Sequence, residues 1–209
     1  MSKTLTGNPD LVDPGFQSPP NNPMDLLKIW LECADRLNIS EPKSLVLSTV
    51  NKTTLRPSSR VVLLKSCDDS GVIFSTSSFS AKGQEIEKNP IAAGNLWWRE
   101  TMQQINFQGL ITKCSDAISD EIFYERTRSA QAIATLSQQS QKLLDEETLR
   151  NQIKALTNSD SKIIRPEHFH AYHLKIDTIE FWHGSKDRLH QRLLYKLNNQ
   201  SWFHERLQP

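Results

Sequence analysis

The feature that most constrains the fold is a series of short apolar and β-branched segments between residues 44 and 114. Their length and composition are typical of β-strands. Five such segments follow one another: residues 44–50, 59–65, 71–76, 91–98 and 103–114. Three more lie near the end of the chain: residues 171–182, 193–197 and 202–207. Residues 53–55 form a short turn between the first two segments, which predicts a hairpin and, with the remaining strands, a small antiparallel barrel.

Helices are predicted around these strands. Asn22 can cap a helix, Pro23 fits its first position, and apolar side chains recur at helical spacing over residues 24–37. Residues 80–89 predict a second, short helix, and residues 116–156 are predicted to be mostly helical and polar. The predicted fold class is therefore mainly β with α, a β-barrel with helices at its periphery.

The length of the chain predicts one compact domain with a flexible end. Its 209 residues suffice for a single hydrophobic core. Residues 1–22 contain four prolines and few apolar side chains, which predicts a flexible N-terminal arm. Residues 23–209 then form the domain, in which no repeat or low-complexity tract occurs.

Charge and composition argue against several classes of protein. The 25 basic and 24 acidic residues give a formal net charge of +1, so we expect no nucleic-acid partner. No apolar run approaches the roughly 20 residues that cross a bilayer, and residues 1–16 lack the apolar core of a secretion signal. We therefore expect no membrane association and a cytoplasmic location. Cys33, Cys67 and Cys114 lie far apart without a CxxC pair, which predicts neither a disulfide framework nor a zinc site.

The strand at residues 59–65 carries a cation at each end of a run of apolar side chains. Because side chains alternate between the two faces of a strand, Arg60 shares a face with Val62 and Leu64, and Lys65 lies on the other face with Val61 and Leu63. If this apolar strand is buried, the two cations suit an anionic ligand placed across the sheet. The pattern alone favours two charges that reach solvent at the strand ends.

Two further clusters could bind a ligand. Residues 188–192 (RLHQR) place two arginines and a histidine just after Phe181 and Trp182, and arginine forks bind carboxylate or phosphate groups. Residues 138–140 (QQS), with Gln103 and Gln104, could hydrogen-bond the heteroatoms of a ring. Taken alone, the first cluster also fits a solvated basic loop and the second an ordinary polar surface.

Other common sites are not indicated. His168, His170 and His173 have no carboxylate or cysteine at useful spacing, so we expect no metal site. The sequence contains no GxGxxG and no GxxxxGK[ST] motif, so neither a Rossmann dinucleotide site nor a P-loop is expected.

Five segments in chain order resemble the pyridoxamine 5′-phosphate oxidase family, over about residue 20 to the end. These segments are residues 22–27 (NPMDLL), 56–65 (RPSSRVVLLK), 139–140 (QS), 179–182 (IEFW) and 188–192 (RLHQR). The resemblance implies an FMN-binding split barrel, a homodimer whose active site lies at the dimer interface, and an oxidase that uses FMN and dioxygen. The implied FMN contacts are Arg60, Val61, Val62, Leu63, Leu64, Lys65, Ser75, Thr76, Lys82, Gln104, Gln139, Ser140, Trp182 and Arg192.

The resemblance also implies a substrate site, which departs from the family pattern. Its contacts fall on Lys65, Arg126, Arg188 and His190. Arg188 and His190 are the implied catalytic residues: they hold the substrate over the flavin, and His190 is a candidate proton acceptor. Ile122 and Ala130 stand where the family has a tyrosine and a serine that help to hold the substrate phosphate, and Ala81 stands where it has a second cation near the FMN phosphate.

Three segments are more similar to the flavin oxidases of phenazine biosynthesis within this family: residues 5–7 (LTG), 19–24 (PPNNPM) and 98–105 (WRETMQQI). This resemblance implies a reduced tricyclic carboxylate as the substrate. Two alternatives stay open, namely a pyridoxamine/pyridoxine 5′-phosphate oxidase that forms pyridoxal 5′-phosphate, and a flavin-binding module without catalytic activity.

Overall fold

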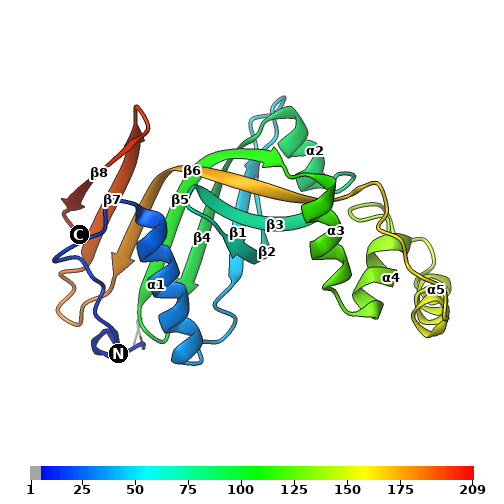
Figure 1. Cartoon of the computed structure of the whole chain (residues 1–209), viewed down its shortest axis with the longest axis horizontal. Helices are drawn as coiled ribbons and strands as arrows, with labels where there is room; N and C mark the ends of the chain where they lie inside the picture. Colours follow the sequence, from blue (N-terminus) through cyan, green and yellow to red (C-terminus); the bar gives the residue numbers. More distant parts are fainter. Residues whose placement is uncertain (1–5) are drawn as a thin grey trace.

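In the computed structural model, which describes residues 6–209, eight antiparallel strands form one sheet that closes into a barrel. Neighbouring strands follow the order β3-β2-β1-β4-β5-β6-β7-β8, and an additional pairing of β3 with β6 closes the first six (Figure 1). The strands are β1 (Ser44–Val50), β2 (Pro57–Cys67), β3 (Gly71–Ser77), β4 (Ile91–Trp98), β5 (Gln103–Lys113), β6 (Phe169–His183), β7 (Gln191–Asn198) and β8 (Ser201–Leu207). The predicted fold class, a β-barrel with peripheral helices, is confirmed.

The long strand β6 belongs to two parts of the sheet. Residues 169–175 pair with β3 and complete the barrel, whereas residues 178–183 pair with β7. Strands β7 and β8 therefore extend the sheet beyond the barrel, at the left of Figure 1. This division separates the residues near the start of β6 from those near its end.

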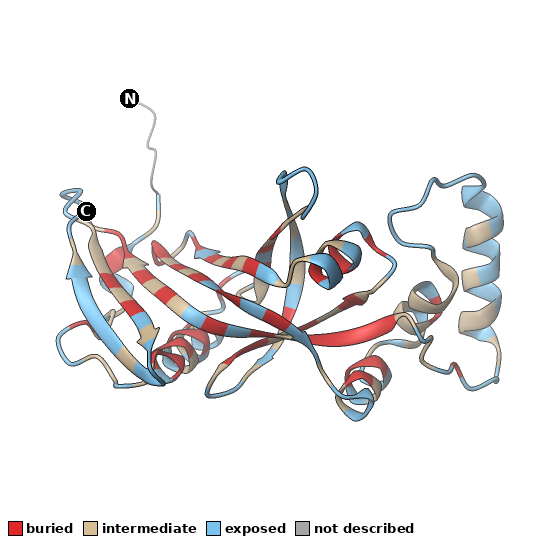
Figure 2. Cartoon of the chain, turned by 90° about the horizontal axis from the view of Figure 1, so that it is seen from above, coloured by how far each residue is buried: buried red, intermediate tan, exposed pale blue. Residues whose placement is uncertain are grey.

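Helix α1 (Pro23–Arg36) packs its apolar side on the sheet. The Asn22 side chain accepts the Met24 N–H and Pro23 occupies the first turn, so the predicted cap is confirmed. Trp30 is 1% exposed and meets Phe181 of β6 edge-on, with ring centroids 5.1 Å apart. Buried and exposed positions alternate along several strands (Figure 2), because successive side chains point to opposite faces of the sheet and only one face packs in the core.

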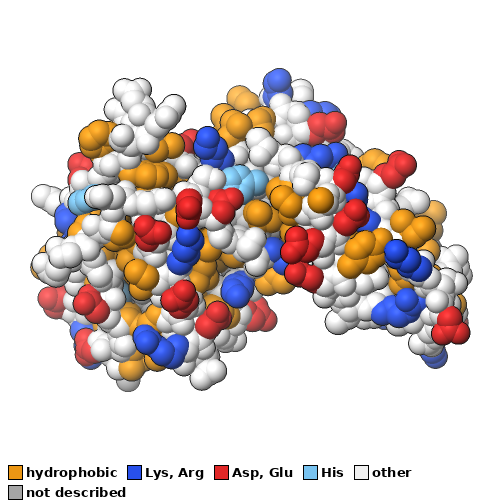
Figure 3. Space-filling model, viewed as in Figure 1, with side chains coloured by type: hydrophobic (Ala, Val, Ile, Leu, Met, Phe, Trp, Pro, Cys, Tyr) orange, Lys and Arg blue, Asp and Glu red, His pale blue; other side chains and the backbone are white. Residues whose placement is uncertain are grey.

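Three helices form a lobe beside the barrel. The region predicted to be helical over residues 116–156 contains α3 (Asp116–Tyr124), α4 (Arg128–Leu136) and α5 (Glu146–Asn158). A small apolar core beneath them includes Phe123, Ala132 and Phe169. The lobe lies at the right of Figure 1, and the surface is indented between it and the barrel (Figure 3). Between residues 6 and 209, no helix combines the length and the hydropathy needed to cross a bilayer.

The described part of the predicted arm runs along the domain. It contains a short 3-10 turn, η1 (Pro9–Leu11). Phe16 is 5% exposed and stacks on Trp30, and the Tyr195 hydroxyl donates to the Pro20 carbonyl at 2.9 Å. Residues 1–5 of this arm lie outside the described residues. The division of the chain into an arm (residues 1–22) and a domain (residues 23–209) stays a prediction.

Two buried histidines make stability dependent on pH. His183 and His170 are 4% and 8% exposed. Burial lowers the pKa of both imidazoles, and the charges of Lys113 and Arg165 lower that of His170 further. Both side chains are therefore neutral in the folded protein over a pH range in which the unfolded chain binds protons.

We expect the free energy of unfolding to fall as the pH drops from 7 to 5. Because the unfolded chain takes up protons from about pH 6.5 downward and the folded chain does not, each histidine should cost on the order of 1 kcal/mol at pH 5. Thermal unfolding at pH 7 and pH 5 measures the effect, which His183→Leu should reduce. Replacing the exposed His204 by leucine is the matched control. An equal pH dependence in wild type and His183→Leu would contradict the assignment.

Candidate functional site

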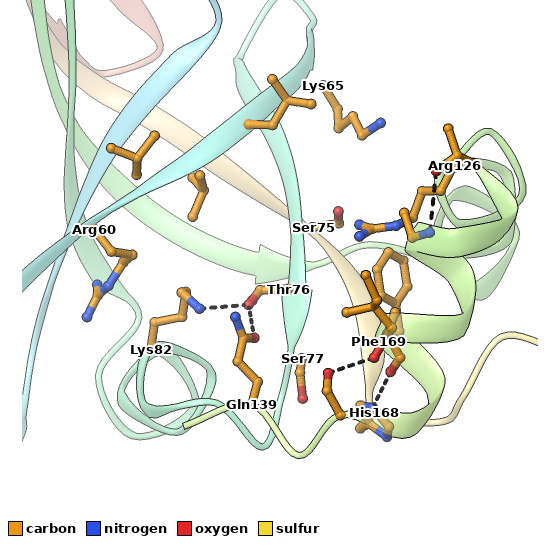
Figure 4. A pocket seen from close by; sticks show the side chains of 18 residues that line it. Arg60, Lys65, Ser75, Thr76, Ser77, Lys82, Arg126, Gln139, His168 and Phe169 are labelled. Atoms are coloured by element: carbon orange, nitrogen blue, oxygen red, sulfur yellow. Dashed lines mark hydrogen bonds between the residues drawn. The ribbon is translucent and has the colours of Figure 1, made fainter. Parts of the chain in front are cut away.

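A cavity of about 680 Å³ lies where β2, β3, α4 and the start of β6 meet (Figure 4). Its volume is in the range of small-molecule sites. Eighteen residues line it: Arg60, Val61, Val62, Leu63, Lys65, Ser75, Thr76, Ser77, Lys82, Arg126, Thr127, Ala130, Ile133, Ala134, Ser137, Gln139, His168 and Phe169. The lining includes four Lys and Arg side chains and no carboxylate, so the cavity is built for an anionic ligand.

Lys82 supplies a buried positive charge at one end of this cavity. It lies in the first turn of α2 (Ala81–Lys88), which Ser80 caps, and it is 8% exposed. Its Nζ donates to Thr76 Oγ1 at 3.2 Å and to Ser80 Oγ at 3.4 Å. Burial lowers the pKa of Lys82, and the nearby charge of Arg60 lowers it further. Because its partners are neutral hydroxyls, the positive charge of Lys82 is not compensated by the protein. An anion bound here would form a charge-assisted hydrogen bond with it.

Arg60 is held by a carboxylate behind the cavity wall. Its Nη2 lies 3.3 Å from Glu85 Oε2 of α2, and its Nη1 donates to Thr49 Oγ1 at 2.6 Å. Burial alone raises the pKa of Glu85, but hydrogen bonds from Thr49 and Ser58 together with the charge of Arg60 outweigh it, and the pKa falls below the usual value. The positive charge of Arg60 is thus partly neutralised, and Lys82 carries the uncompensated charge at this end.

Arg126 and Lys65 lie at the other end of the cavity (Figure 4). The Arg126 guanidinium stands over the Phe169 ring, 5.3 Å from its centroid. Its Nε is buried and has no hydrogen-bond partner among residues 6–209. Burial lowers the pKa of this guanidinium. A buried donor without an acceptor costs free energy, which a ligand carboxylate or phosphate would recover.

The cavity brings together ten of the residues implied by the family resemblance: Arg60, Val61, Val62, Leu63, Lys65, Ser75, Thr76, Lys82, Arg126 and Gln139. Gln139 Oε1 accepts from Thr76 Oγ1 at 3.4 Å, and Ser140 Oγ accepts the Ala81 N–H at 3.1 Å, so both residues lie beside the start of α2. Leu64 is an exception, since its side chain is 2% exposed and faces the barrel core.

In the single chain, only one face of β2 is buried. Val61 and Leu63 are 64% and 56% exposed, whereas Leu64 on the opposite face is buried. Both exposed side chains line the cavity, and pattern alone does not distinguish an apolar face that packs in the core from one that faces a ligand site.

A second group of implied residues lies away from this cavity. Gln104, Trp182 and Arg192 are direct neighbours across β5, β6 and β7, so they share one face of the sheet. The His190 ring lies 4.7 Å from that of Trp182. Arg192 makes two hydrogen bonds with Glu180, at 2.7 and 3.0 Å, which raise its pKa. Gln104, Trp182, Arg188, His190 and Arg192 are all absent from the lining of the cavity in the same chain.

The loop that carries Arg188 and His190 is a defined turn. The Ser185 carbonyl accepts the Arg188 N–H at 3.1 Å, and Asp187 Oδ1 accepts the Leu189 N–H at 2.9 Å. Arg188 has a φ of 70°, a left-handed conformation that is uncommon for a residue with a side chain. An ion pair between Lys186 and Asp10 joins the loop to the segment before α1. These contacts all lie within one chain and define the conformation of the loop.

Several cavity residues were not predicted from sequence, chiefly Thr127, Ile133 and Ala134 of the lobe and Phe169 of β6. The pairing of β3 with β6 brings these distant segments to the cavity, and a helix cap or an apolar side chain carries no separate signal of a ligand site. No group of three or more His, Cys, Asp or Glu side chains between residues 6 and 209 is arranged to hold a metal ion.

Comparison with protein families covers most of the chain. The pyridoxamine 5′-phosphate oxidase model matches residues 32–160, and the model of the pyridoxine 5′-phosphate oxidase C-terminal dimerisation region matches residues 169–209. The chain belongs to the pyridoxamine 5′-phosphate oxidase family. The second match contains the strand extension β7–β8 and the loop with Arg188 and His190.

Individual members of the pyridoxamine 5′-phosphate oxidase family are similar over 90% or more of the chain. A dihydrophenazinedicarboxylate synthase of Pseudomonas chlororaphis is 40% identical over 209 residues, which are 100% of this chain and 94% of the relative. A pyridoxine/pyridoxamine 5′-phosphate oxidase of Acaryochloris marina is 38% identical over 90% of this chain and 86% of its own. The crystal structure of PhzG from Burkholderia lata 383 with tetrahydrophenazine-1-carboxylic acid superposes with a TM-score of 0.93, at 39% identity, over 97% of this chain and 100% of that chain.

The departures from the pyridoxamine 5′-phosphate oxidase family pattern lie in different places. Ala130 lines the cavity, so its lack of a hydroxyl changes the ligand site directly. Ile122 is 6% exposed and packs in the small core of the lobe. Ala81 begins α2 and is exposed. Both substrate-side departures replace a polar side chain with an apolar one.

Proposed function

We propose that this chain is a homodimeric, FMN-dependent oxidase that uses dioxygen and oxidises a reduced, carboxylated phenazine precursor. The observation that carries the proposal is a cavity with cations at both ends and no carboxylate in its lining. The dihydrophenazinedicarboxylate synthase and PhzG relatives support the choice of substrate.

The end of the cavity with Lys82 fits the phosphate of FMN. Lys82 offers a charge without an anionic partner, Thr76 and Ser140 offer hydroxyls, and Gln139 offers an amide. These are the donor types that bind a phosphate and the polar edge of a ring system. When bound, FMN supplies the two-electron redox chemistry that links oxidation of the substrate to reduction of dioxygen.

The end with Lys65 and Arg126 fits a carboxylated aromatic substrate. The two cations would pair with carboxylates, and the apolar walls made by Ala130, Ile133 and Phe169 would pack on flat rings. A phosphate held at Ala130 would lack the hydroxyl that a serine would donate there, at a cost of about 1–3 kcal/mol. This favours a carboxylate over a phosphate as the anionic group of the substrate.

A homodimer would complete this site. In a twofold dimer each contact occurs twice, once from each chain to the other. The cavity of one chain would then be completed by five residues of the other: Gln104, Trp182, Arg188, His190 and Arg192. The exposed apolar side chains Val46, Val61, Leu63 and Trp97 on β1, β2 and β4 offer a surface for such a contact. The match to a C-terminal dimerisation region supports the same arrangement.

Two impaired variants should therefore complement each other. With a low concentration of a carboxylated substrate, we expect Arg126→Leu and Arg188→Leu homodimers each to lose at least about tenfold in rate, because they damage the two separate groups of residues. After mixing, unfolding and refolding in equal amounts, half of the dimers combine one chain of each kind and hold one intact site, so about a quarter of the wild-type activity should return. A mixture no more active than its components would show that both groups act within one chain.

The proposed activity is tested by anaerobic loss of flavin absorbance. The FMN-loaded protein is mixed with a dihydro- or tetrahydrophenazine carboxylate, or with pyridoxine 5′-phosphate, and then exposed to air. Bleaching by the phenazine compound and recovery in air are the expected result. Bleaching by pyridoxine 5′-phosphate alone would favour the vitamin B6 alternative, and bleaching by neither would favour a flavin-binding module. A chain that takes up no FMN would refute all three.

A further inference from the structure

The imidazole of His190 has one of its two nitrogens already engaged by the protein. The backbone N–H of Ser185 donates a hydrogen bond to His190 Nδ1 at 3.1 Å. A backbone N–H can only donate, so Nδ1 must present its lone pair. In the neutral imidazole the single proton is then on Nε2. The structure thereby selects one of the two tautomers.

The position of the Ser185 N–H is set by its surroundings. The Gly184 N–H donates to the Met102 carbonyl at 2.8 Å, and a Cβ at Gly184 would come within 2.4 Å of Met102 Cε, so the backbone lies tightly against this residue. On the other side, the Ser185 carbonyl accepts the Arg188 N–H. The Trp182 ring, whose centroid lies 4.7 Å from that of the imidazole, holds the position of the ring, and the hydrogen bond from the Ser185 N–H favours the orientation that directs Nδ1 to it.

We infer that His190 binds the substrate as a hydrogen-bond donor through its Nε2–H, and that it is not the group that accepts the substrate proton. A neutral imidazole accepts a proton only at its unprotonated nitrogen, and here that nitrogen faces the Ser185 amide. Moving the proton from Nε2 to Nδ1 would point two N–H groups at each other. The role of proton acceptor, for which the sequence makes His190 a candidate, is therefore excluded by this contact.

The inference names the chemistry of the bound group. Arg188, two residues before His190, carries only hydrogen-bond donors, and the one free nitrogen of His190 is also a donor. The pair therefore offers N–H groups to an acceptor such as a carboxylate or a ring oxygen. This deepens the proposed function and rests on it for the identity of the substrate. The tautomer itself rests only on the contact between Ser185 and His190.

The tautomer is tested by two-bond ¹H–¹⁵N spectra of the ¹⁵N-labelled full chain. The six histidines give separate patterns, and His190 is assigned as the one that disappears in His190→Gln. We expect the Nε2–H pattern at neutral pH. Ser185→Pro, which removes the donating N–H, should weaken this preference, and Ser185→Ala, which keeps the N–H, should not. An Nδ1–H pattern in the wild type, or a preference unchanged by Ser185→Pro, would overturn the inference.

The donor role is tested with three variants at His190. Glutamine places an amide N–H near the position of Nε2, asparagine places it near Nδ1, and phenylalanine keeps only the ring. We expect His190→Gln to stay within about tenfold of the wild type in flavin reduction, and the other two variants to lose at least tenfold, mainly through KM. If His190 accepts the proton, glutamine should lose as much as phenylalanine, about 10²- to 10⁴-fold, in the reduction rate at saturating substrate.

The two proposals fail in different ways. If the wild type oxidises no phenazine carboxylate, the proposed function is wrong, and the tautomer spectrum still decides the inference. If the wild type is active but His190→Gln is as impaired as His190→Phe, the proposed function stands and the donor role of His190 is wrong.

Discussion

Replacing Lys82 by methionine is expected to lower the affinity for FMN by about ten- to one-hundredfold without destabilising the apoprotein. Lys82 is buried, and the hydrogen bonds of its ammonium group go to the neutral hydroxyls of Thr76 and Ser80. A hydrogen bond between charged groups contributes about 1.5–3 kcal/mol, and its loss corresponds to that range of affinity.

Lys82→Met should lower the affinity for FMN but should not lower the stability of the apoprotein. Burial lowers the pKa of Lys82, which means that the folded apoprotein holds this charge at a cost. Methionine fills a similar volume without a charge, so the melting temperature of the apoprotein should stay the same or rise. A residue that merely supports the fold would lower stability and affinity together.

FMN titration and thermal unfolding of the apoprotein provide both readouts. The matched control is Lys88→Met, at an exposed position in the last turn of the same helix α2, which should change neither quantity. If Lys82→Met binds FMN as tightly as Lys88→Met does, Lys82 does not hold the phosphate.

Much of the fold is predictable because its causes are local. The strand β1 and the helix α1 follow from composition, periodicity and the Asn22 cap, and all of these act within a few residues of the chain. The closure of the barrel is different, since β3 pairs with the first half of β6, whose residues follow roughly 100 positions later in the chain (Ser77 pairs with Phe169 and Gly71 with Lys175). No local pattern shows that β6 leaves the barrel partway along its length.

The site was predictable only as a set of residue types. Motifs resembling the family named Lys82, Arg126 and Arg192, but they could not show that the first two share a cavity while the third lies elsewhere in the same chain. Nor could they show that Glu85 partly neutralises Arg60, because that contact depends on where α2 lies against β2. Partners that meet through tertiary packing leave no spacing rule in the sequence.

Arg126 and Arg128, two residues apart, are expected to respond to substitution in opposite ways. The Nε of Arg126 has no partner in the described part of the chain, and its guanidinium faces the cavity over Phe169. Arg128 instead donates to the carbonyls of Leu156, Thr157, Ser159 and Ser161. It therefore holds the C-terminal end of α5, where backbone carbonyls lack partners within the helix and a cation is favourable.

For Arg126→Leu we expect kcat/KM with a carboxylated substrate to fall by about ten- to one-hundredfold, because a hydrogen bond between charged groups is lost. The melting temperature should not fall, since burial already lowers the pKa of this guanidinium and leucine relieves that cost. With an uncarboxylated dihydrophenazine, the wild type and the variant should react at similar rates.

For Arg128→Leu we expect the reverse. Hydrogen bonds from a charged group contribute about 1.5–3 kcal/mol, and a chain of this size loses roughly 2–4 °C of melting temperature per kcal/mol, so the melting temperature should fall by several degrees. Well below that temperature, the ratio of rates for carboxylated and uncarboxylated substrates should stay near the wild-type value. If Arg126→Leu lowers both rates equally, or if Arg128→Leu alone changes their ratio, Arg126 is not the residue that selects the carboxylate.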